Sequence, residues 1–208
     1  KFYSEKIIYM PNSYINSIRY EYSNLKPEHK KLNLPKGSFL LAAFHNPKKI
    51  SEEVMHSWKS ILMQTDNTYL WLKISNEIAK QNIISFFQSN NVDIKRILFA
   101  EKVDLYSEHI ARYSQADLFL DTFRYNGHTT ILECVWSELP FISLAGESFA
   151  SRVGLSIANS LGLPELIAKS SEEYVEKVIF YTKNLDHLSI IKNQIIKQKK
   201  CGDFFNQK

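Results

Sequence analysis

The sequence lacks any apolar run that approaches the roughly 20 residues needed for a membrane-spanning helix. Its first residues carry no signal-peptide pattern, and the start at Lys1 rather than Met is consistent with a fragment. Cysteine is scarce, because Cys134 and Cys201 are the only two and they do not have the spacing of metal ligands. We therefore expect a cytoplasmic protein with reduced thiols and no membrane partner.

No long segment of the chain concentrates charge of one sign. The formal net charge of +4 is spread through most segments, and the one basic cluster is Lys197, Lys199 and Lys200. This cluster is typical of a solvated helix end rather than of a nucleic-acid patch. The sequence also lacks a metal-ligand set, a Gly-x-Gly-x-x-Gly run, a P-loop and a supported Ser–His–Asp arrangement. We expect neither a metal nor a nucleic-acid partner.

Apolar residues are plentiful, at 44% with 13 Phe and 11 Tyr, which is ample for a folded core. Five apolar runs of strand length alternate with helical patterns of about 10–15 residues. The expected strands are 38–44, 68–74, 96–100, 118–121 and 140–144, and only helices are expected after Pro164, near 170–183 and 186–199. The pattern predicts an α/β fold, in which a Rossmann-like parallel sheet is covered by helices on both faces and is followed by C-terminal helices.

Residues 1–35 differ in kind from residues 36–208. Ile7–Met10 can form a short strand, but the segment from Tyr14 to Pro35 is polar, rich in tyrosine and aperiodic. Such a stretch is long for a structureless loop inside a compact domain, so it suggests a link between lobes or the tail of a preceding unit. We therefore divide the chain at residue 35 into a connecting segment and one α/β lobe.

The most informative stretch is 117–139. An apolar strand leads into a loop with Gly127 and His128, and Thr129 and Thr130 then open an amphipathic helix. This arrangement suits a phosphate, because the free N–H groups and the dipole of a helix N-terminus attract anions and a glycine lets the backbone come close. The threonine hydroxyls add donors or cap the helix. The alternative is an ordinary N-capped helix that follows a strand.

Other candidate residues follow expected strands, where parallel sheets bind ligands. Lys49 can place a charge on a phosphate or a leaving-group oxygen, and the alternative is a solvent-exposed lysine. His109 and Arg112 share one helix face, so they can hold a flat base, or they are ordinary surface residues. His128 can act as a base, a phosphate donor or a loop-stabilising residue. Glu133 can reach a ribose diol, or it is a surface residue favoured by the helix dipole.

The run at 117–154 carries a more specific signal. It contains NGHTT at 126–130, followed by GESFASRVG at 146–154. Together these motifs resemble the catalytic region of the O-linked N-acetylglucosamine transferase family, including its bacterial TPR-linked and plant Spindly-type members. Supporting matches follow the chain in order at 44–50, 108–113 and 161–168. The resemblance covers nearly the whole chain.

This resemblance implies the C-terminal lobe of a GT-B glycosyltransferase. Such an enzyme transfers a sugar, here expected to be GlcNAc, from UDP to Ser or Thr of polypeptides, with inversion and without a metal or other cofactor. Residues 36–208 are then the nucleotide-sugar-binding lobe, and residues 1–35 are the tail of a missing N-terminal lobe and the interlobe linker. The expected partners are that lobe, TPR repeats, the UDP-sugar and the polypeptide acceptor. The fragment alone is expected to be inactive.

The resemblance also assigns roles by matched position. Lys49 resembles the lysine that neutralises the departing diphosphate, and His128 belongs to the same phosphate loop, so these two are the expected catalytic residues. The expected UDP-sugar site comprises Asn46, Lys49, His109, Arg112, Gly127, His128, Thr129, Thr130 and Glu133.

Several positions depart from the family pattern. Arg124 and Ala145 replace usual prolines, Tyr106 stands where some animal members have Lys, and Glu133 replaces a common Asp. Because relatives use GlcNAc, glucose or fucose, these changes leave the sugar open. The acceptor can also be a metabolite instead of a polypeptide. The alternative function is a catalytically silent nucleotide-binding or protein-interaction domain with the same fold.

Overall fold

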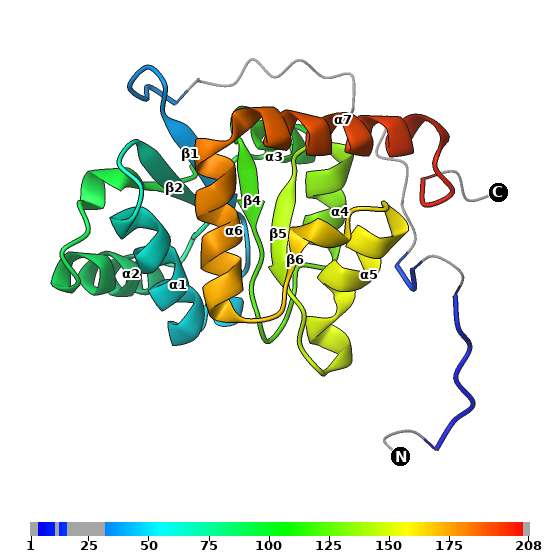
Figure 1. The fold of residues 1–208 in the computed structure, drawn as a ribbon. Helices are drawn as coiled ribbons and strands as arrows, with labels where there is room; N and C mark the ends of the chain where they lie inside the picture. Colours follow the sequence, from blue (N-terminus) through cyan, green and yellow to red (C-terminus); the bar gives the residue numbers. More distant parts are fainter. Residues whose placement is uncertain (1–3, 11–12, 16–31, 206–208) are drawn as a thin grey trace.

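The strand order of the sheet reverses at one place, between β1 and β4. The structure is a computed structural model that describes residues 4–10, 13–15 and 32–205, and within them six parallel strands form one sheet in the order β3-β2-β1-β4-β5-β6 (Figure 1). The strands are β1 (Phe39–Ala43), β2 (Thr68–Leu72), β3 (Ile97–Phe99), β4 (Leu118–Leu120), β5 (Phe141–Leu144) and β6 (Ile167–Ala168). In open α/β sheets, ligands bind beyond the carboxyl ends of the strands at such a switch point.

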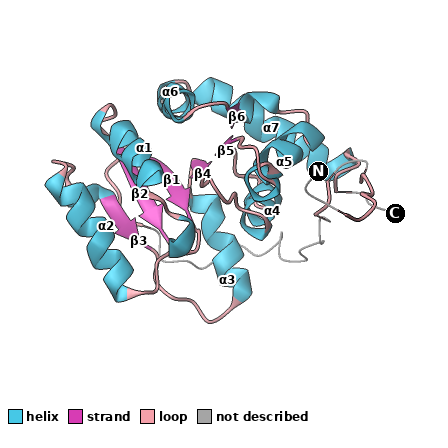
Figure 2. Cartoon of the chain, turned by 90° about the horizontal axis from the view of Figure 1, so that it is seen from below, coloured by secondary structure: helices cyan, strands magenta, loops and turns pink. Residues whose placement is uncertain are grey.

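Helices cover both faces of the sheet, as the sequence predicts. α1 (Glu52–Met63) and α6 (Ser171–Lys183) pack together on one face, and α3 (Tyr106–Ala111) and α4 (Thr129–Trp136) lie on the other (Figure 2). The other α-helices are α2 (Glu77–Ser89), α5 (Val153–Ser160) and α7 (Leu185–Cys201), of which α7 runs across one end of the sheet (Figure 1). None of the helices in the described part of the chain combines the length and apolar composition that a membrane crossing requires.

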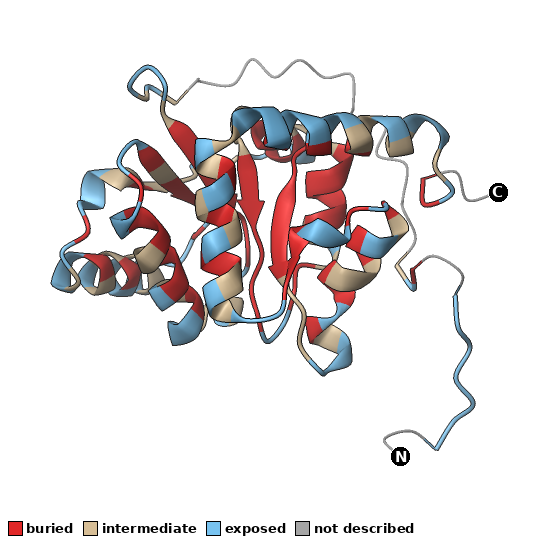
Figure 3. Cartoon of the chain, viewed as in Figure 1, coloured by how far each residue is buried: buried red, intermediate tan, exposed pale blue. Residues whose placement is uncertain are grey.

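The core explains why the strands read as continuous apolar runs. Every residue of β1 is buried, at 6% exposed or less, because helices lie on both sides of the strand (Figure 3). Trp58 of α1, Phe119 of β4 and Tyr174 of α6 are among the largest fully buried side chains. The core therefore fixes the strand ends that carry the loops of the candidate site.

Two expectations about strands are wrong. The sequence predicts only helices after Pro164, but β6 follows it and pairs with β5. The prediction missed β6 because a strand of two residues is too short to leave a recognisable apolar pattern. Ile7–Met10 does not form a strand, and its side chains are between 52% and 87% exposed. Among the described residues this segment pairs with no strand, so its backbone lacks the hydrogen bonds that would hold it extended in a sheet.

The helical segment over residues 148–161 is divided in two. A 3₁₀ turn, η5 (Phe149–Ser151), comes first, and α5 begins only at Val153. The side chains of Ser148 and Ser151 bond reciprocally to each other's backbone N–H, which closes a capping box over one turn. Residues on both sides of this helix break contact the loop that follows β4.

Asp121, the first residue after β4, organises that loop. Its side chain is fully buried, and its carboxylate accepts hydrogen bonds from the N–H of Thr122 at 2.8 Å, from the N–H of Gly127 at 2.6 Å and from the Ser143 hydroxyl. The Asp121 carbonyl accepts a further bond from Tyr174 of α6 at 3.0 Å. These bonds fix both ends of the loop and tie it to β5 and α6.

Asn126 joins the loop to the segment that contains the helix break. Its N–H donates to the Ala150 carbonyl at 2.8 Å, and its side-chain oxygen accepts from the N–H of Gly154 at 3.2 Å. Gly154 in turn lies so close to the Ser143 side chain that a Cβ atom at this position would overlap it. The two sequence motifs at 126–130 and 146–154 are therefore halves of one packed unit.

His45 lies beneath the same loop. Its Nε2 donates to the Leu120 carbonyl at 2.9 Å and lies 3.7 Å from the Asp121 carboxylate. Burial lowers the pKa of His45 to about 4, and burial raises the pKa of Asp121 to about 7 against the opposing effect of its hydrogen bonds. A Cβ at Gly127 would stand only 3.0 Å from His45 Cε1 and 3.1 Å from Ile131, so a side chain at this position would have to displace its neighbours.

Gly154→Ala tests the packed unit. The added methyl group would overlap Ser143, so we expect the free energy of unfolding to fall by about 1–3 kcal/mol in chemical denaturation. Asn159→Ala, at an exposed position of the same helix, is the control and should change the stability by much less. An unchanged stability of Gly154→Ala would show that the two motifs are not tightly packed.

His45→Asn tests the opposed titrations. The Asp121 contribution to stability is full below pH 4 and is lost as the pH rises toward 7, whereas the His45 contribution is full above pH 6.5 and is lost as the pH falls toward 4. The two largely cancel in the unmodified protein. Without His45, we expect the free energy of unfolding to fall with rising pH between 4 and 7, by up to about 1.4 kcal/mol per pH unit.

This profile is measured by urea denaturation across that pH range. His187→Asn, which removes an exposed histidine, should keep the profile of the unmodified protein. Parallel profiles for His45→Asn and the unmodified protein would contradict the assignment of opposed titrations to His45 and Asp121.

Candidate functional site

The N-terminus of α4 is open at the carboxyl end of β4. His128 is the N-cap residue and its side chain makes no capping bond, while the hydroxyls of Thr129 and Thr130 bond to no described residue. Thr129 is exposed and Thr130 is partly exposed. The alternative of an ordinary N-capped helix is therefore wrong, because α4 has no side-chain cap. The N–H groups of the first turn and both hydroxyls remain available to an anion.

Lys49 reaches this loop from the segment after β1. It ends the 3₁₀ turn η2 (Pro47–Lys49), and its Nζ donates to the Asn126 carbonyl at 2.9 Å and lies 4.0 Å from the Tyr125 ring centroid. Burial lowers the pKa of the Lys49 ammonium, and the Asp121 carboxyl opposes that shift. Lys49 is therefore part of the packed loop rather than a free surface lysine, and it brings a positive charge to the switch point.

Asn46 has a local role in the same segment. Its side-chain oxygen accepts from the N–H of Lys48 at 3.0 Å and caps η2, which orients the turn that ends at Lys49. Asn46 is exposed, so its amide N–H₂ group faces solvent near the loop.

His128 lies among aromatic rings at the edge of the loop. Its ring stacks on Tyr125 with centroids 4.8 Å apart, and its Nδ1 is 2.7 Å from the Tyr14 hydroxyl. Phe149 contacts the Tyr14 ring edge-on with centroids 4.7 Å apart. Burial lowers the pKa of His128, which favours the neutral imidazole at physiological pH.

A cavity of about 570 Å³ opens beside the loop, beyond the ends of β1, β2 and β3. Its lining includes Phe44, Lys73, Tyr106, His109, Arg112, Thr130 and Glu133. Thr130 therefore belongs both to the open helix N-terminus and to the cavity wall. One elongated ligand can contact the two regions at the same time.

Glu133 is the buried acidic residue of the cavity lining, which also includes the exposed Glu101 and Asp104. It is 7% exposed, and its carboxylate accepts from the Tyr106 hydroxyl at 2.6 Å and from the Tyr113 hydroxyl at 2.8 Å, with His109 Nε2 at 3.3 Å. Burial alone would raise the pKa of the Glu133 carboxyl, but the hydrogen bonds from His109, Tyr106 and Tyr113 hold it below its usual range. The surface interpretation of Glu133 is wrong, and the group is an ionised acceptor in the wall of the cavity.

His109 and Arg112 are also buried rather than on the surface, at 8% and 4% exposed. Arg112 donates from Nη2 to the Glu101 carbonyl at 3.2 Å, and its guanidinium lies 5.8 Å from the Phe44 ring centroid. Burial lowers the pKa of Arg112, but a guanidinium keeps its charge in proteins. Both side chains face the cavity from α3 and the turn that follows it, as a shared helix face predicts.

Sequence reasoning missed the residues that hold these groups in place. Asp121 and His45 support the loop from below, and Glu133 is supported by Tyr106 of α3 and by Tyr113 of the 3₁₀ turn that follows α3. An acidic residue directly after an apolar strand is a visible signal for Asp121. The spacing of Tyr106, His109 and Tyr113, at three and four residues, is visible too, but it identifies only a common helix face.

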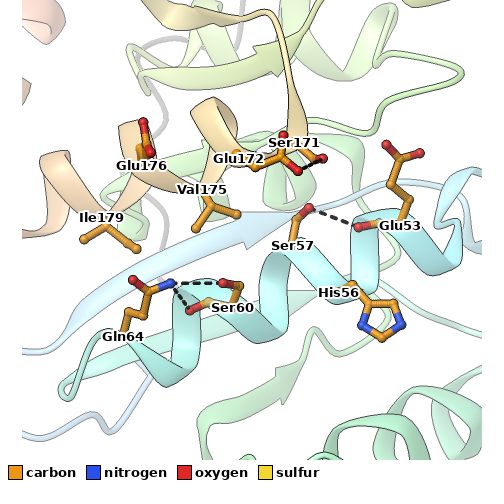
Figure 4. A pocket seen from close by; sticks show the side chains of 10 residues that line it. All are labelled: Glu53, His56, Ser57, Ser60, Gln64, Ser171, Glu172, Val175, Glu176 and Ile179. Atoms are coloured by element: carbon orange, nitrogen blue, oxygen red, sulfur yellow. Dashed lines mark hydrogen bonds between the residues drawn. The ribbon is translucent and has the colours of Figure 1, made fainter.

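A second hollow of about 530 Å³ lies between α1 and α6 (Figure 4). Val175 and Ile179 of α6 line it opposite Ser57 of α1 and Gln64, the C-cap residue of α1, and Ser57 donates to the Glu53 carbonyl at 3.0 Å. None of the residues that the sequence predicts for the site lines this hollow. The predicted site residues gather instead at the carboxyl ends of the strands.

Comparison with solved structures supports the fold. An O-GlcNAc transferase mutant from Thermobaculum terrenum superposes with a TM-score of 0.77 over 89% of this chain and 36% of that chain, at 22% sequence identity. The likeness confirms the predicted fold, the C-terminal lobe of a GT-B glycosyltransferase.

Comparison with curated proteins identifies the family. The chain is 32% identical over 200 residues to the Arabidopsis thaliana protein named "Probable UDP-N-acetylglucosamine–peptide N-acetylglucosaminyltransferase SEC", covering 93% of this chain and 20% of the relative. It is 30% identical to the UDP-N-acetylglucosamine–peptide N-acetylglucosaminyltransferase of Caenorhabditis elegans, covering 96% of this chain and 16% of the relative. The chain thus spans a fifth or less of the length of these relatives. The profile of glycosyl transferase family 41 matches residues 23–208, and the chain belongs to that family.

Proposed function

We propose that the chain is the UDP-sugar-binding lobe of an inverting, metal-independent O-glycosyltransferase that transfers GlcNAc from UDP to Ser or Thr of polypeptides. The observation that carries the proposal is the meeting of Lys49 and the open N-terminus of α4 at the switch point, next to a cavity with an ionised carboxylate. The names of the two curated relatives support the donor and the acceptor.

Lys49 and α4 supply the positive electrostatics that the reaction needs. Cleavage of the bond from the sugar to UDP leaves negative charge on the diphosphate, which a metal-independent enzyme has to stabilise with its own groups. In the structure, the ammonium of Lys49 is held by a carbonyl and an aromatic ring, which are neutral, and it forms no ion pair within the described residues, although the Asp121 carboxyl lies near enough to interact with it. The α4 N-terminus adds N–H donors and the positive end of a helix dipole. His128 lies in the same loop, and we assign it to the diphosphate end of the donor.

The cavity beside the loop suits the nucleoside. His109 and Arg112 offer a ring and a planar guanidinium for the uracil base, and Glu133 offers a carboxylate for the ribose hydroxyls. Thr130 lies between these groups and the diphosphate end. The order of chemical groups along the site therefore matches a base, a ribose and a diphosphate in sequence. Asn46 lies near Lys49 at the rim of the diphosphate end.

The remaining parts of the proposed enzyme are supported by the family and by the length of the relatives. The acceptor polypeptide would enter between this lobe and an N-terminal lobe, for which residues 1–35 provide the tail and linker. TPR repeats would guide the acceptor. We propose that the lobe acts inside the cell and that it has little or no transfer activity alone. A silent domain of the same fold would bind UDP without transfer, and a protein-interaction domain would not bind UDP.

Thr129→Ala/Thr130→Ala tests the nucleotide site. Because both hydroxyls lack partners among the described residues, their removal should leave the stability nearly unchanged while it weakens UDP binding by at least about tenfold. Calorimetric titration with UDP measures the affinity, and Thr182→Ala on α6 is the control. Equal affinity of the double variant and the unmodified protein would refute the assignment of the diphosphate to α4.

Lys49→Ala tests the catalytic role in the full-length protein. Stabilisation of the departing diphosphate matters most in the transition state, so we expect sugar transfer to fall by about 10²–10³-fold and UDP affinity by less than about tenfold. Lys48→Ala is a matched control, because Lys48 is the exposed neighbour in the same 3₁₀ turn. Normal turnover by Lys49→Ala would rule out this role.

A further inference from the structure

Residues 13–15 pack against the lobe although they lie outside its assigned range of 36–208. Ser13 is buried, and the Ser156 hydroxyl of α5 donates to the Ser13 hydroxyl at 3.4 Å. Ile15 is partly buried and packs against the hydrophobic core. Tyr14 lies between these two residues, and its side chain reaches His128, the N-cap residue of α4. The short segment is therefore held against the lobe on both sides of Tyr14.

The His128 ring is enclosed by aromatic side chains. It stacks on Tyr125, and the rings of Tyr14 and Phe149 meet it edge-on with centroids 5.8 Å and 6.2 Å away. Its Nδ1 lies 2.7 Å from the Tyr14 hydroxyl, whereas its Nε2 is shielded from solvent and makes no well-aligned hydrogen bond with a described residue. Among the described side chains, Tyr14 therefore sets the hydrogen bonding of this ring.

The chemistry of the two groups favours one direction for this hydrogen bond. Burial lowers the pKa of His128 against the opposing effect of the Ala150 carbonyl, so the ring is neutral at physiological pH and one of its nitrogens is an acceptor. A phenol is a stronger acid than the N–H of a neutral imidazole, and an imidazole nitrogen is a stronger base than a phenol oxygen. These differences favour donation from Tyr14 to Nδ1, with the ring proton on Nε2.

We propose that Tyr14 is a positioning residue for the diphosphate end of the site, and that it acts by donating its hydroxyl proton to His128 Nδ1. The proposal rests on the proposed binding of UDP at α4. Because α4 begins without a side-chain capping bond, the contacts of the His128 ring help to place its first turn. The N–H groups of that turn are the donors available to an anion. A residue of the connecting segment thus contributes to the nucleotide site of the lobe.

Nitrogen NMR spectra of the histidine rings test the hydrogen bond without a nucleotide. At neutral pH the unmodified protein should show His128 with a protonated Nε2 and an unprotonated Nδ1, and His128→Ala identifies its signals by their loss. Tyr14→Phe keeps the ring contacts and removes the hydroxyl, so it should populate the other tautomer as well. Tyr9→Phe, at a side chain that is 87% exposed, is the matched control and should leave the His128 signals unchanged.

Calorimetric titration with UDP tests whether the hydrogen bond matters to the nucleotide site. Tyr14→Phe should weaken UDP binding by about three- to tenfold, which is the range expected for the loss of one hydrogen bond. In the His128→Ala background the same change should alter the affinity by less than about twofold, because Tyr14 then has no ring to position. Tyr9→Phe should bind UDP as the unmodified protein does.

Other results would overturn the inference in distinguishable ways. A proton on Nδ1 in the unmodified protein would show that Tyr14 accepts instead of donates. Full affinity of Tyr14→Phe would show that Tyr14 positions nothing at the nucleotide site, although the proposed function stands. An equal loss in the His128→Ala background would show that Tyr14 does not act through His128. If the unmodified protein binds no UDP, the proposed function fails and this positioning role fails with it, whatever the spectra show.

Discussion

The buried carboxylate of Asp121 is the interaction on which the rest of the site depends. A buried carboxyl is costly unless its oxygens accept hydrogen bonds. Asp121 obtains them from the N–H groups of Thr122 and Gly127 and from the Ser143 hydroxyl. The bonds that make its burial tolerable are the same bonds that set the path of the loop. That path brings the Asn126 carbonyl to Lys49 and starts α4 without a side-chain cap.

The charged groups of the site are held by partners that leave them available. Within the described residues, Lys49 bonds to a carbonyl and lies against a ring, and Glu133 accepts from two tyrosine hydroxyls. A closely paired lysine and carboxylate would cancel each other, but here they occupy the two ends of one elongated site. The Lys49 end suits an anionic diphosphate, and at the other end the Glu133 carboxylate suits neutral hydroxyl donors, although cationic side chains such as Lys73 and Arg112 line the same cavity. In the proposed complex, this placement of Lys49 and Glu133 would orient a nucleoside diphosphate in one direction.

The sequence predicts those parts of the fold that depend on short-range pattern. Buried parallel strands read as apolar runs, so the strands β1 to β5 were predictable, and a helix that follows a glycine-containing loop predicts the anion site. β6 is too short to leave a pattern. The burial of Glu133 depends on how closely α3 approaches α4, which no local pattern reports. Gly127 was expected to admit a ligand, but it also lies close to the buried His45, a contact that no local pattern reports.

The residues of the two sequence motifs divide into scaffold and ligand groups, and the division bears on function. Asn126, Gly127 and Gly154 make the contacts that hold the loop, so a domain that had lost its activity would still need them. Resemblance at these positions alone cannot separate an active enzyme from a silent relative. Thr129 and Thr130 are different, because their hydroxyls bond to no described residue. Their presence at an uncapped helix N-terminus is best explained by a ligand, and the proposed nucleotide-sugar site rests on that distinction.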